Sequence, residues 1–360
     1  MKLLRLTPAL KSTSAPYNQF SLGFKEIIDQ TVFSLHYYHD VTIDKNIDVL
    51  HGSGSIFKAY RLLRRLVNTN QYDVVHIHNG LTGIIFILAL FPFNLTLLKK
   101  SVFTLHNSWY VLKTRNQILD LIVMLASRVV CTCGQSSYDS IPKIIKFFIG
   151  NKTIPVVNGF DHERIDNVEN KNLNKRNFDN ASNIKIVYVG ALNNTKNQIA
   201  LLEALKVTKV EAEIIFLGDG DNKQKLLNFS RSIPDSINIS FKGLVSRDLA
   251  LEHMLEADVC ISLSKGEGLP IAVLEAMYAG CFMILSSIPP HLEVSPPKDR
   301  CIFVDIFEKD QIIDSLNYVI KNLDEIKKGR EKSKEYSITN FSVNNMLEGY
   351  RKVYSSLNEK

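Results

Sequence analysis

Short apolar runs recur along the chain, separated by longer segments in which polar and apolar residues mix. Apolar runs bounded by glycine, histidine or asparagine are typical of buried parallel strands, and the longer segments can hold crossover helices. The N-terminal half has predicted strands at residues 3–6, 32–36, 74–79, 101–106 and 129–133. The C-terminal half repeats the pattern at residues 185–190, 212–217, 237–241 and 259–263. Two such series predict an α/β protein with two Rossmann-like, doubly wound parallel-sheet domains.

Helices are predicted between these strands at 21–30, 56–68, 116–126, 136–148, 198–206, 250–256 and 271–279, with a loop at 7–17. The apolar run at residues 81–98 is different, because its 18 residues reach the lower limit of a membrane span. Pro92, Asn94 and Thr96 interrupt the run, and it lies between two predicted strands. We therefore predict a buried or interfacial helix there.

Domain boundaries are suggested by a change in composition. Residues 166–183 contain seven asparagines and few apolar residues, which is typical of a linker or a surface excursion. This segment separates an N-terminal domain at 1–165 from a C-terminal domain at 184–340. Residues 341–360 are predicted to form a terminal helix, whose apolar stripe consists of Leu347, Tyr350, Val353, Tyr354 and Leu357.

The stretch at 257–280 carries the strongest chemical signal. A strand is followed by a glycine-containing loop, and then by an almost wholly apolar helix that begins after Pro270. Glu267 lies in the loop and Glu275 lies within the helix. Because a buried carboxylate without a partner is costly, we expect both to accept hydrogen bonds from hydroxyls of a polar ligand. The alternative is a boundary glutamate at 275 and a charge that favours the helix N-terminus at 267.

Glu267-Gly268-Leu269-Pro270, followed by Glu275, resembles the E-x7-E motif of retaining glycosyltransferases with the GT-B fold, in particular family 4. The resemblance implies two domains facing across a cleft. The N-terminal domain would select the acceptor, and the C-terminal domain would bind the nucleotide-sugar donor. It also implies that the terminal helix crosses back to the N-terminal domain.

The resemblance also assigns roles to residues. Glu267 would bind sugar hydroxyls, Glu275 the ribose diol, and the amides near Gly268 and Leu269 the leaving diphosphate. His106, at a strand end, would position the transferred sugar. We therefore take Glu267, His106 and Lys196 as the catalytic candidates.

The loop from Gly190 to Lys196 resembles the family's phosphate loop, in which an arginine and a lysine hold the diphosphate. Lys196 matches the lysine, whereas Ala191 stands at the arginine position, and Lys265 is the candidate replacement. The family's Gly-Gly pair in the first loop is also absent, since residues 12–16 read Ser-Thr-Ser-Ala-Pro. Ligands bind at the carboxyl ends of parallel strands, and Gly218 lies at such an end, as do His78, His106, Gly190, Gly243 and Glu267.

We expect same-face displacement with retention, no cofactor beyond the donor, and no metal, since no cluster of metal ligands is evident. Two alternatives stay open. One is a nucleotide-sugar epimerase of the same fold, and the other is a catalytically silent scaffolding subunit, which Ala191 and the missing Gly-Gly pair would favour. Nothing in the sequence names the sugar, the base, the acceptor or the oligomeric state.

Charge and cysteine content suggest where the protein works. Residues 1–150 hold 16 Lys/Arg against 8 Asp/Glu, while residues 151–360 hold 27 against 29. A basic half favours phosphate partners, whether of nucleic acid, lipid headgroups or a lipid-linked diphosphate; the alternative is ordinary solvated surface. The family resemblance implies a polyprenyl-linked glycan acceptor at an anionic membrane surface, and no nucleic acid. Arg61, Arg64 and Arg65, with Lys99 and Lys100, are the expected membrane contacts.

Five cysteines, an odd number, favour reduced thiols in the cytoplasm. The opening residues read as a first strand, because they are too short for a signal-peptide core. The expected location is cytoplasmic and peripheral at the inner face of the cell membrane. The Asn- and Lys-rich composition suggests bacterial cell-surface polysaccharide assembly.

Overall fold

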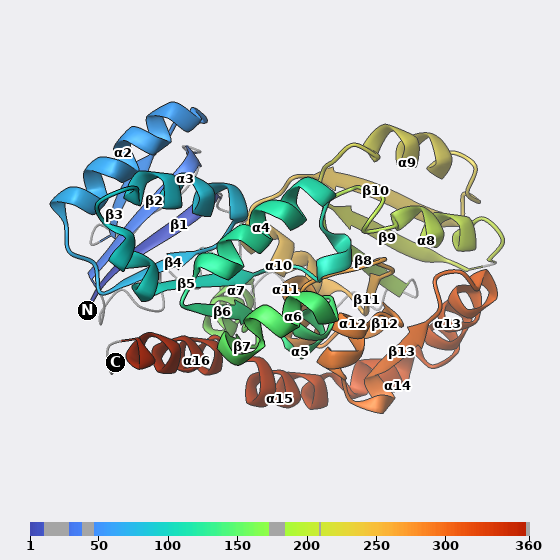
Figure 1. Ribbon diagram of the computed structural model, residues 1–360. Helices are drawn as coiled ribbons and strands as arrows, with labels where there is room; N and C mark the ends of the chain where they lie inside the picture. Colours follow the sequence, from blue (N-terminus) through green and yellow to red (C-terminus); the bar gives the residue numbers. More distant parts are fainter. Residues whose placement is uncertain (11–28, 38–46, 173–183, 209, 358–360) are drawn as a thin grey trace. The chain divides into compact units, whose positions relative to one another are not determined.

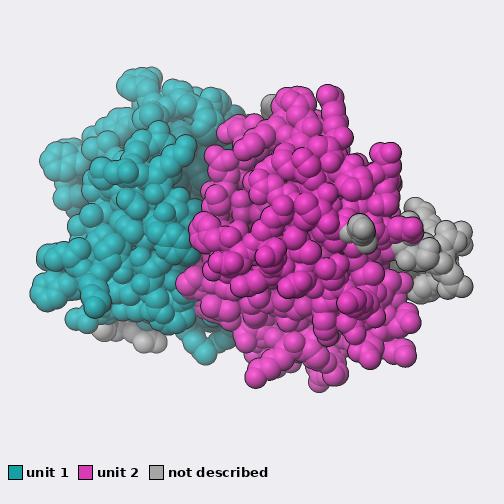
Figure 2. All heavy atoms as spheres, turned by 90° about the vertical axis from the view of Figure 1, so that its right-hand side faces the viewer, with its two compact units in different colours: residues 1–159, 343–360 teal, residues 160–342 magenta. Residues whose placement is uncertain are grey.

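A computed structural model describes residues 1–10, 29–37, 47–172, 184–208 and 210–357. The chain forms two compact units, coloured separately in Figure 2. Unit 1 comprises Met1–Gly159 and Val343–Lys360, and unit 2 comprises Phe160–Ser342. Helix α7 (His162–Asn172) occupies the start of the predicted linker. The rest of that linker lies outside the described residues, as do the Ser-Thr-Ser-Ala-Pro loop and most of the helix predicted at 21–30.

Unit 1 contains a sheet of seven described strands, all parallel, in the order β3-β2-β1-β4-β5-β6-β7. The strands are β1 (Lys2–Leu10), β2 (Asp29–Tyr37), β3 (Ile47–His51), β4 (Val74–Ile77), β5 (Ser101–Leu105), β6 (Val129–Thr132) and β7 (Thr153–Pro155). Strand β1 runs four residues beyond its predicted end, into the expected loop, because it pairs with β2 as far as Leu10. The edge strands β3 and β7 were not predicted.

Helices cover both faces of this sheet (Figure 1). The helices are α2 (Ile56–Thr69), α3 (Gly80–Leu90), α4 (Thr114–Ala126), α5 (Gln135–Asp139), α6 (Lys143–Ile149) and α16 (Val343–Ser356). Apolar residues of α2, α3, α4 and α6 share one core with one face of the sheet. Leu347, Tyr350 and Val353 of α16 pack on the other face, against Leu3 and Val74.

The apolar run at 81–98 folds as a largely buried α3, followed by the 3-10 helix η1 (Leu95–Lys100). Asn79 caps α3, since its side chain accepts hydrogen bonds from the backbone amides of Leu81 and Thr82. None of the described helices combines the length and apolarity that a membrane span requires. The single helix predicted at 136–148 is two helices, because Pro142 lies between α5 and α6.

Unit 2 contains a sheet of six described parallel strands in the order β10-β9-β8-β11-β12-β13. The strands are β8 (Ile184–Val189), β9 (Ala212–Leu217), β10 (Ile237–Gly243), β11 (Val259–Ser262), β12 (Phe282–Ser286) and β13 (Cys301–Val304). The strand order reverses between β8 and β11. The loops that follow these two strands therefore lie at the switch point of the sheet, which is where open α/β sheets bind ligands.

The helices of unit 2 are α7, α8 (Gln198–Leu205), α9 (Lys223–Ser230), α10 (Arg247–Glu256), α11 (Ile271–Tyr278), α12 (Pro289–Val294), α13 (Lys309–Lys321), α14 (Leu323–Lys328) and α15 (Arg330–Phe341). Buried Arg300 fixes the end of α11. Its guanidinium donates to the Gly280 carbonyl at 2.8 Å, to the Ile326 carbonyl and to the Ser333 hydroxyl at 3.2 Å.

Candidate functional site

The loops after β8 and β11 are tied together by hydrogen bonds. The Lys265 amide donates to the Thr195 carbonyl at 2.8 Å, and the Asn197 side chain donates to the Leu263 carbonyl at 3.2 Å. The hydroxyl of buried Tyr188 accepts from the Leu263 amide at 2.8 Å and donates to the Lys196 carbonyl. The loops at the switch point are thus fixed relative to each other before any ligand binds.

Two of the predicted residues meet here. Lys196 Nζ lies 2.6 Å from Glu267 Oε1, and the Ser264 hydroxyl donates to the same oxygen at 2.6 Å. Burial alone would raise the pKa of Glu267, but the charge of Lys196 and the hydrogen bonds from Lys196 and Ser264 outweigh it. The pKa of Glu267 is therefore below its ordinary value. The carboxylate is an anion at neutral pH.

A buried histidine extends this cluster. His291 on α12 is fully buried, and its Nδ1 lies 2.9 Å from the Ser286 hydroxyl, while its Nε2 lies 3.4 Å from the Ser262 hydroxyl. Ser262 in turn lies 3.4 Å from Ser264. Burial lowers the pKa of His291 to about 4, although the charge of Glu267 opposes this, so the ring is neutral at neutral pH. Ser264 and His291 were missed, since a buried polar relay leaves no spacing pattern in the sequence.

Glu275 occupies a second polar position, on α11. It is 6% exposed, so it is not a boundary residue, and its carboxylate pairs with Arg247 on α10. Burial raises the pKa of Glu275 by more than the charges of Arg247 and Arg164 lower it. We expected a ligand to supply the hydrogen-bond partner of Glu275. Arg247 supplies it instead, and this arginine was not predicted from the sequence.

Of the predicted glycines, Gly190 lies beside Lys196, and Gly218 lies beside Gly190. A Cβ on Gly190 would lie 3.2 Å from Lys196 Cε. Gly218 has a φ of +138°, and a Cβ there would lie 2.1 Å from the Gly190 carbonyl oxygen, so only glycine allows the loops after β8 and β9 to meet. Gly268 and Leu269 are buried just before α11, whereas the Lys265 side chain is exposed.

The prediction of metal independence overlooked one Asp-x-Asp tripeptide, Asp219-Gly220-Asp221, in the loop after β9. Asp219 Oδ2 lies 3.0 Å from Lys223 Nζ, and Oδ1 accepts from the Gly220 amide at 2.8 Å. Its carboxylate is thus already engaged by the protein. Within the described residues, no group of three or more His, Cys, Asp or Glu side chains could hold a metal ion. Metal independence stays a prediction.

Unit 1 carries its own polar cluster, at the carboxyl ends of β4 and β5. His106 Nε2 lies 3.0 Å from His78 Nδ1, and the ring of His78 lies 3.9 Å from that of His76. His76 is fully buried between the Thr104 hydroxyl at 2.7 Å and the Tyr354 hydroxyl at 2.6 Å. Burial lowers the pKa of His106 to about 4, so the predicted strand-end histidine is neutral at neutral pH.

Comparison with protein families matches both halves of the chain. Residues 169–338 match the family of glycosyl transferases group 1, and residues 29–144 match Glycosyltransferase Family 4. The chain is 28% identical over 249 residues to the capsular polysaccharide biosynthesis glycosyltransferase CapH of Staphylococcus aureus, covering 66% of this chain and 65% of that one. The chain thus spans just under two thirds of that relative.

Two further proteins are similar to this chain, one in sequence and one in fold. The chain is 25% identical over 265 residues to the UDP-Gal:alpha-D-GlcNAc-diphosphoundecaprenol alpha-1,3-galactosyltransferase of Escherichia coli, covering 69% of this chain and 65% of that one. The crystal structure of HepE from Anabaena, in complex with UDP and glucose, matches 99% of this chain and 100% of its own with a TM-score of 0.78 at 15% identity. The E-x7-E stretch, Lys196 and the switch point all fall in the group 1 region. The chain therefore belongs to the GT-B-fold, family-4-like glycosyltransferases, with a group 1 domain at residues 169–338.

Proposed function

We propose that this glycosyltransferase is a retaining enzyme. It would move a sugar from a nucleotide-sugar to a glycan or polyprenyl-linked glycan acceptor during bacterial cell-surface polysaccharide assembly. The observation that carries the proposal is the Lys196–Glu267–Ser264 cluster at the switch point of the group 1 domain. The capsular relative and the relative with a diphosphoundecaprenol substrate support this acceptor class.

A uridine diphosphate sugar is the donor class that this proposal favours, because the HepE structure contains UDP and glucose. Lys196 would hold the diphosphate, with the amides near Gly268 and Leu269. Glu267 would accept hydrogen bonds from the sugar hydroxyls. Glu275 would bind the ribose diol, and this requires that it share its carboxylate with Arg247.

The reaction needs charge stabilisation more than a protein nucleophile. Breaking the sugar–phosphate bond develops negative charge on the diphosphate and positive charge on the sugar ring. Lys196 would stabilise the negative charge on the diphosphate, and the Glu267 anion would stabilise the positive charge on the sugar ring. Neutral His106 would position the sugar through hydrogen bonds without adding a competing positive charge. Same-face departure and attack would retain the anomeric configuration, with no metal ion and no further cofactor.

Incubation of the full chain with a panel of nucleotide-sugars tests the proposal. A donor that binds the folded protein should raise its melting temperature. With a polyprenyl-linked glycan added as acceptor, that donor should then be turned over in the presence of a chelator, and NMR of the glycoside formed should show the donor's anomeric configuration. An inverted product would overturn the retaining mechanism. Full loss of activity in chelator, restored by magnesium or manganese, would overturn metal independence. Epimerisation of the nucleotide-sugar without transfer to the acceptor, or binding without turnover, would support the alternatives.

We place the reaction at the inner face of the cell membrane, because a polyprenyl-linked acceptor is available to the enzyme only at a membrane surface. Vesicle binding by the basic N-terminal half, weakened by salt, is the expected behaviour.

A further inference from the structure

The helical layer of unit 1 is exceptionally poor in acidic residues. From Ser55 to Gly159 the chain carries 12 Lys and Arg residues but only three acidic residues, Asp73, Asp120 and Asp139. Asp120 is buried, and Asp73 Oδ2 accepts a hydrogen bond from the Lys2 amide at 2.7 Å. Asp139 is the only acid of the three that is exposed. The charged side chains on the outer surface of α2, α4 and α6 are therefore almost all cationic.

The outward faces of α4 and α6 are apolar. Residues 118, 122 and 125 lie on one face of α4, and residues 144, 147 and 148 lie on one face of α6. The two helices are in contact. We call the six side chains the α4/α6 patch, and each is between 45% and 82% exposed: Ile118, Ile122, Leu125, Ile144, Phe147 and Phe148. A grouped set of exposed large apolar residues marks an interaction surface.

Cations border this patch. Arg115 precedes the α4 stripe by one turn and Lys143 opens α6, and both are exposed. Lys152 Nζ donates to the Leu125 and Ser127 carbonyls at 2.8 Å each, which fixes one positive charge at the end of α4. Helix α6 carries no acidic residue, and the one acid of α4, Asp120, is buried. The nearest exposed acid in the sequence is Asp139, at the end of α5.

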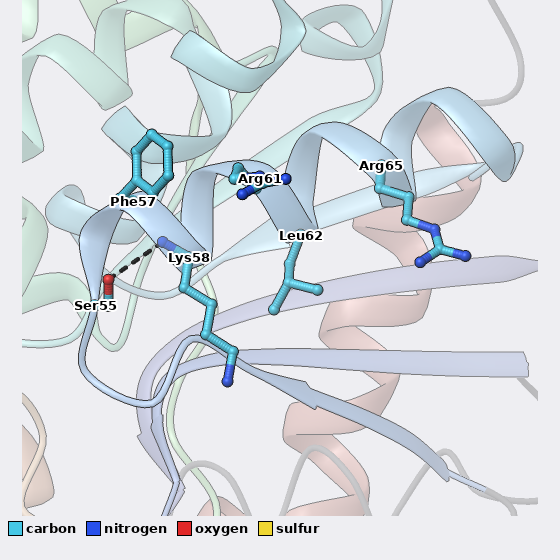
Figure 3. Close-up of a pocket in the computed structure, with 6 residues that line it drawn as sticks. All are labelled: Ser55, Phe57, Lys58, Arg61, Leu62 and Arg65. Carbon is cyan, nitrogen blue, oxygen red and sulfur yellow. Dashed lines mark hydrogen bonds between the residues drawn. The ribbon is translucent and has the colours of Figure 1, made fainter.

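A second basic surface lies on α2. Figure 3 shows Lys58, Arg61 and Arg65 along this helix, where they line a pocket of about 490 Å³ with Ser55, Phe57 and Leu62. Arg64, which the sequence grouped with Arg61 and Arg65, instead donates to the Tyr60 hydroxyl at 2.8 Å and to the Phe91 carbonyl at 3.1 Å. The α2 surface therefore offers charge together with two exposed apolar side chains, Ile56 and Phe57, and it is the competing candidate for a membrane contact.

We propose that the α4/α6 patch inserts into the headgroup region of an anionic lipid bilayer, with the surrounding cations on lipid phosphates. Lysine is depleted from protein–protein interfaces, whereas Lys and Arg beside Phe and Leu are typical of helices that lie in a membrane interface. The positive surface complements anionic lipid. The inference rests on the proposed function for its membrane location, and it adds which surface makes the contact.

Co-sedimentation of the full chain with phosphatidylcholine vesicles, with and without phosphatidylglycerol, tests this. Phe147→Ser/Phe148→Ser and Ile118→Ser/Ile122→Ser should each weaken binding to the anionic vesicles about tenfold or more. The matched control is Leu244→Ser/Phe307→Ser in unit 2, whose side chains are 71% and 85% exposed, and it should bind like wild type. High salt should reduce wild-type binding.

A fluorescence measurement tests insertion directly. The chain has one tryptophan, buried Trp109, so Phe147→Trp adds a single exposed reporter. Its emission should shift to the blue on anionic vesicles, and lipids brominated on the acyl chain should quench it, whereas the Phe307→Trp control should not respond. Unchanged emission from the Phe147→Trp variant on anionic vesicles would overturn the proposal.

Three other outcomes would also overturn it. The membrane contact would move to α2 if both patch variants bound vesicles as well as wild type and the Lys58→Gln/Arg61→Gln/Arg65→Gln variant did not bind. A concentration-dependent dimer that only the patch variants lose would make the patch an interface between two copies. Absence of vesicle binding, together with normal turnover of a nucleotide-sugar, would reject this inference and leave the proposed transferase activity intact.

Discussion

The Glu267 carboxylate is held as an anion by Lys196 and Ser264, against the effect of its own burial. Glu267→Gln keeps the size of the side chain but removes its charge. We expect this variant to lower kcat by about 10²-fold or more while it binds nucleoside diphosphate at least as well, because Lys196 is released. Initial rates and titration calorimetry measure the two effects. Glu256→Gln, at an exposed position on α10, is the control, and normal turnover by Glu267→Gln would remove Glu267 from the mechanism.

The same ion pair makes stability depend on pH. The folded-state pKa of Glu267 lies below its ordinary 4.5, so the stabilisation is present above that value and is lost as the pH falls through the folded pKa. Lys196→Ala removes the cation that lowers the pKa of Glu267, so burial raises that pKa in the folded state. We expect this variant to be less stable at neutral pH by about 2–3 kcal/mol. Urea unfolding should show a gap between wild type and variant that is widest at neutral pH and narrows toward about pH 4. A gap that stays constant with pH would contradict this.

Helices α10 and α11 are joined through Arg247 and Glu275. Glu275→Ala leaves the largely buried Arg247 without its carboxylate partner, so we expect weaker nucleotide binding together with a loss of about 3 kcal/mol in stability. The paired variant Arg247→Met/Glu275→Leu should recover most of the stability but not the nucleotide affinity. Chemical denaturation and calorimetry of the three proteins separate the two effects. Recovery of both properties would mean that Glu275 has only a structural role.

Strands β4 and β5 bring His78 beside His106 at their carboxyl ends. We expect His78 to be a positioning residue, because its ring orients the His106 ring and fixes which nitrogen of His106 carries the proton. His78→Ala should lower kcat about tenfold with little change in the donor KM, and His78→Asn should restore part of it by supplying a hydrogen-bond partner. Equal losses in both variants, or a loss confined to KM, would argue against positioning.

The strands that sequence could predict are mostly short and rich in apolar residues, such as β4, β5, β8 and β11, although the apolar β12 was not predicted. Strand β3 mixes Asp48 and His51 with apolar residues, and β7 is three residues long, so neither stands out from a loop. The candidate site divides in the same way. Lys196 and Glu267 were predicted from motifs, and they meet. Ser264, His291 and Arg247 were not, because their roles depend on burial and on contacts between distant segments.

At the scale of the whole molecule, both ends of the chain belong to unit 1, and unit 2 lies between them in sequence. Unit 1 therefore depends on its last helix, since Leu3, Val74 and Val102 of the sheet pack against α16. The fully buried Tyr354 contributes both to this core and to the hydrogen bond with His76. Unit 2 builds its own core from residues 184–326.

This division predicts two separable unfolding transitions. Tyr354→Ala should destabilise unit 1 by about 3–5 kcal/mol, because it leaves a cavity and removes one of the two hydroxyl partners of buried His76. A nucleotide-sugar should raise the melting temperature only of the transition that Tyr354→Ala leaves unchanged, since the proposed donor site lies in unit 2. Differential scanning calorimetry of wild type and variant, with and without ligand, measures both shifts. If the variant and the ligand shift the same transition, either the two units unfold as one or the donor binds to unit 1. Tyr354→Phe, which keeps the ring and loses only the hydroxyl, should lower the unit 1 transition by a smaller amount.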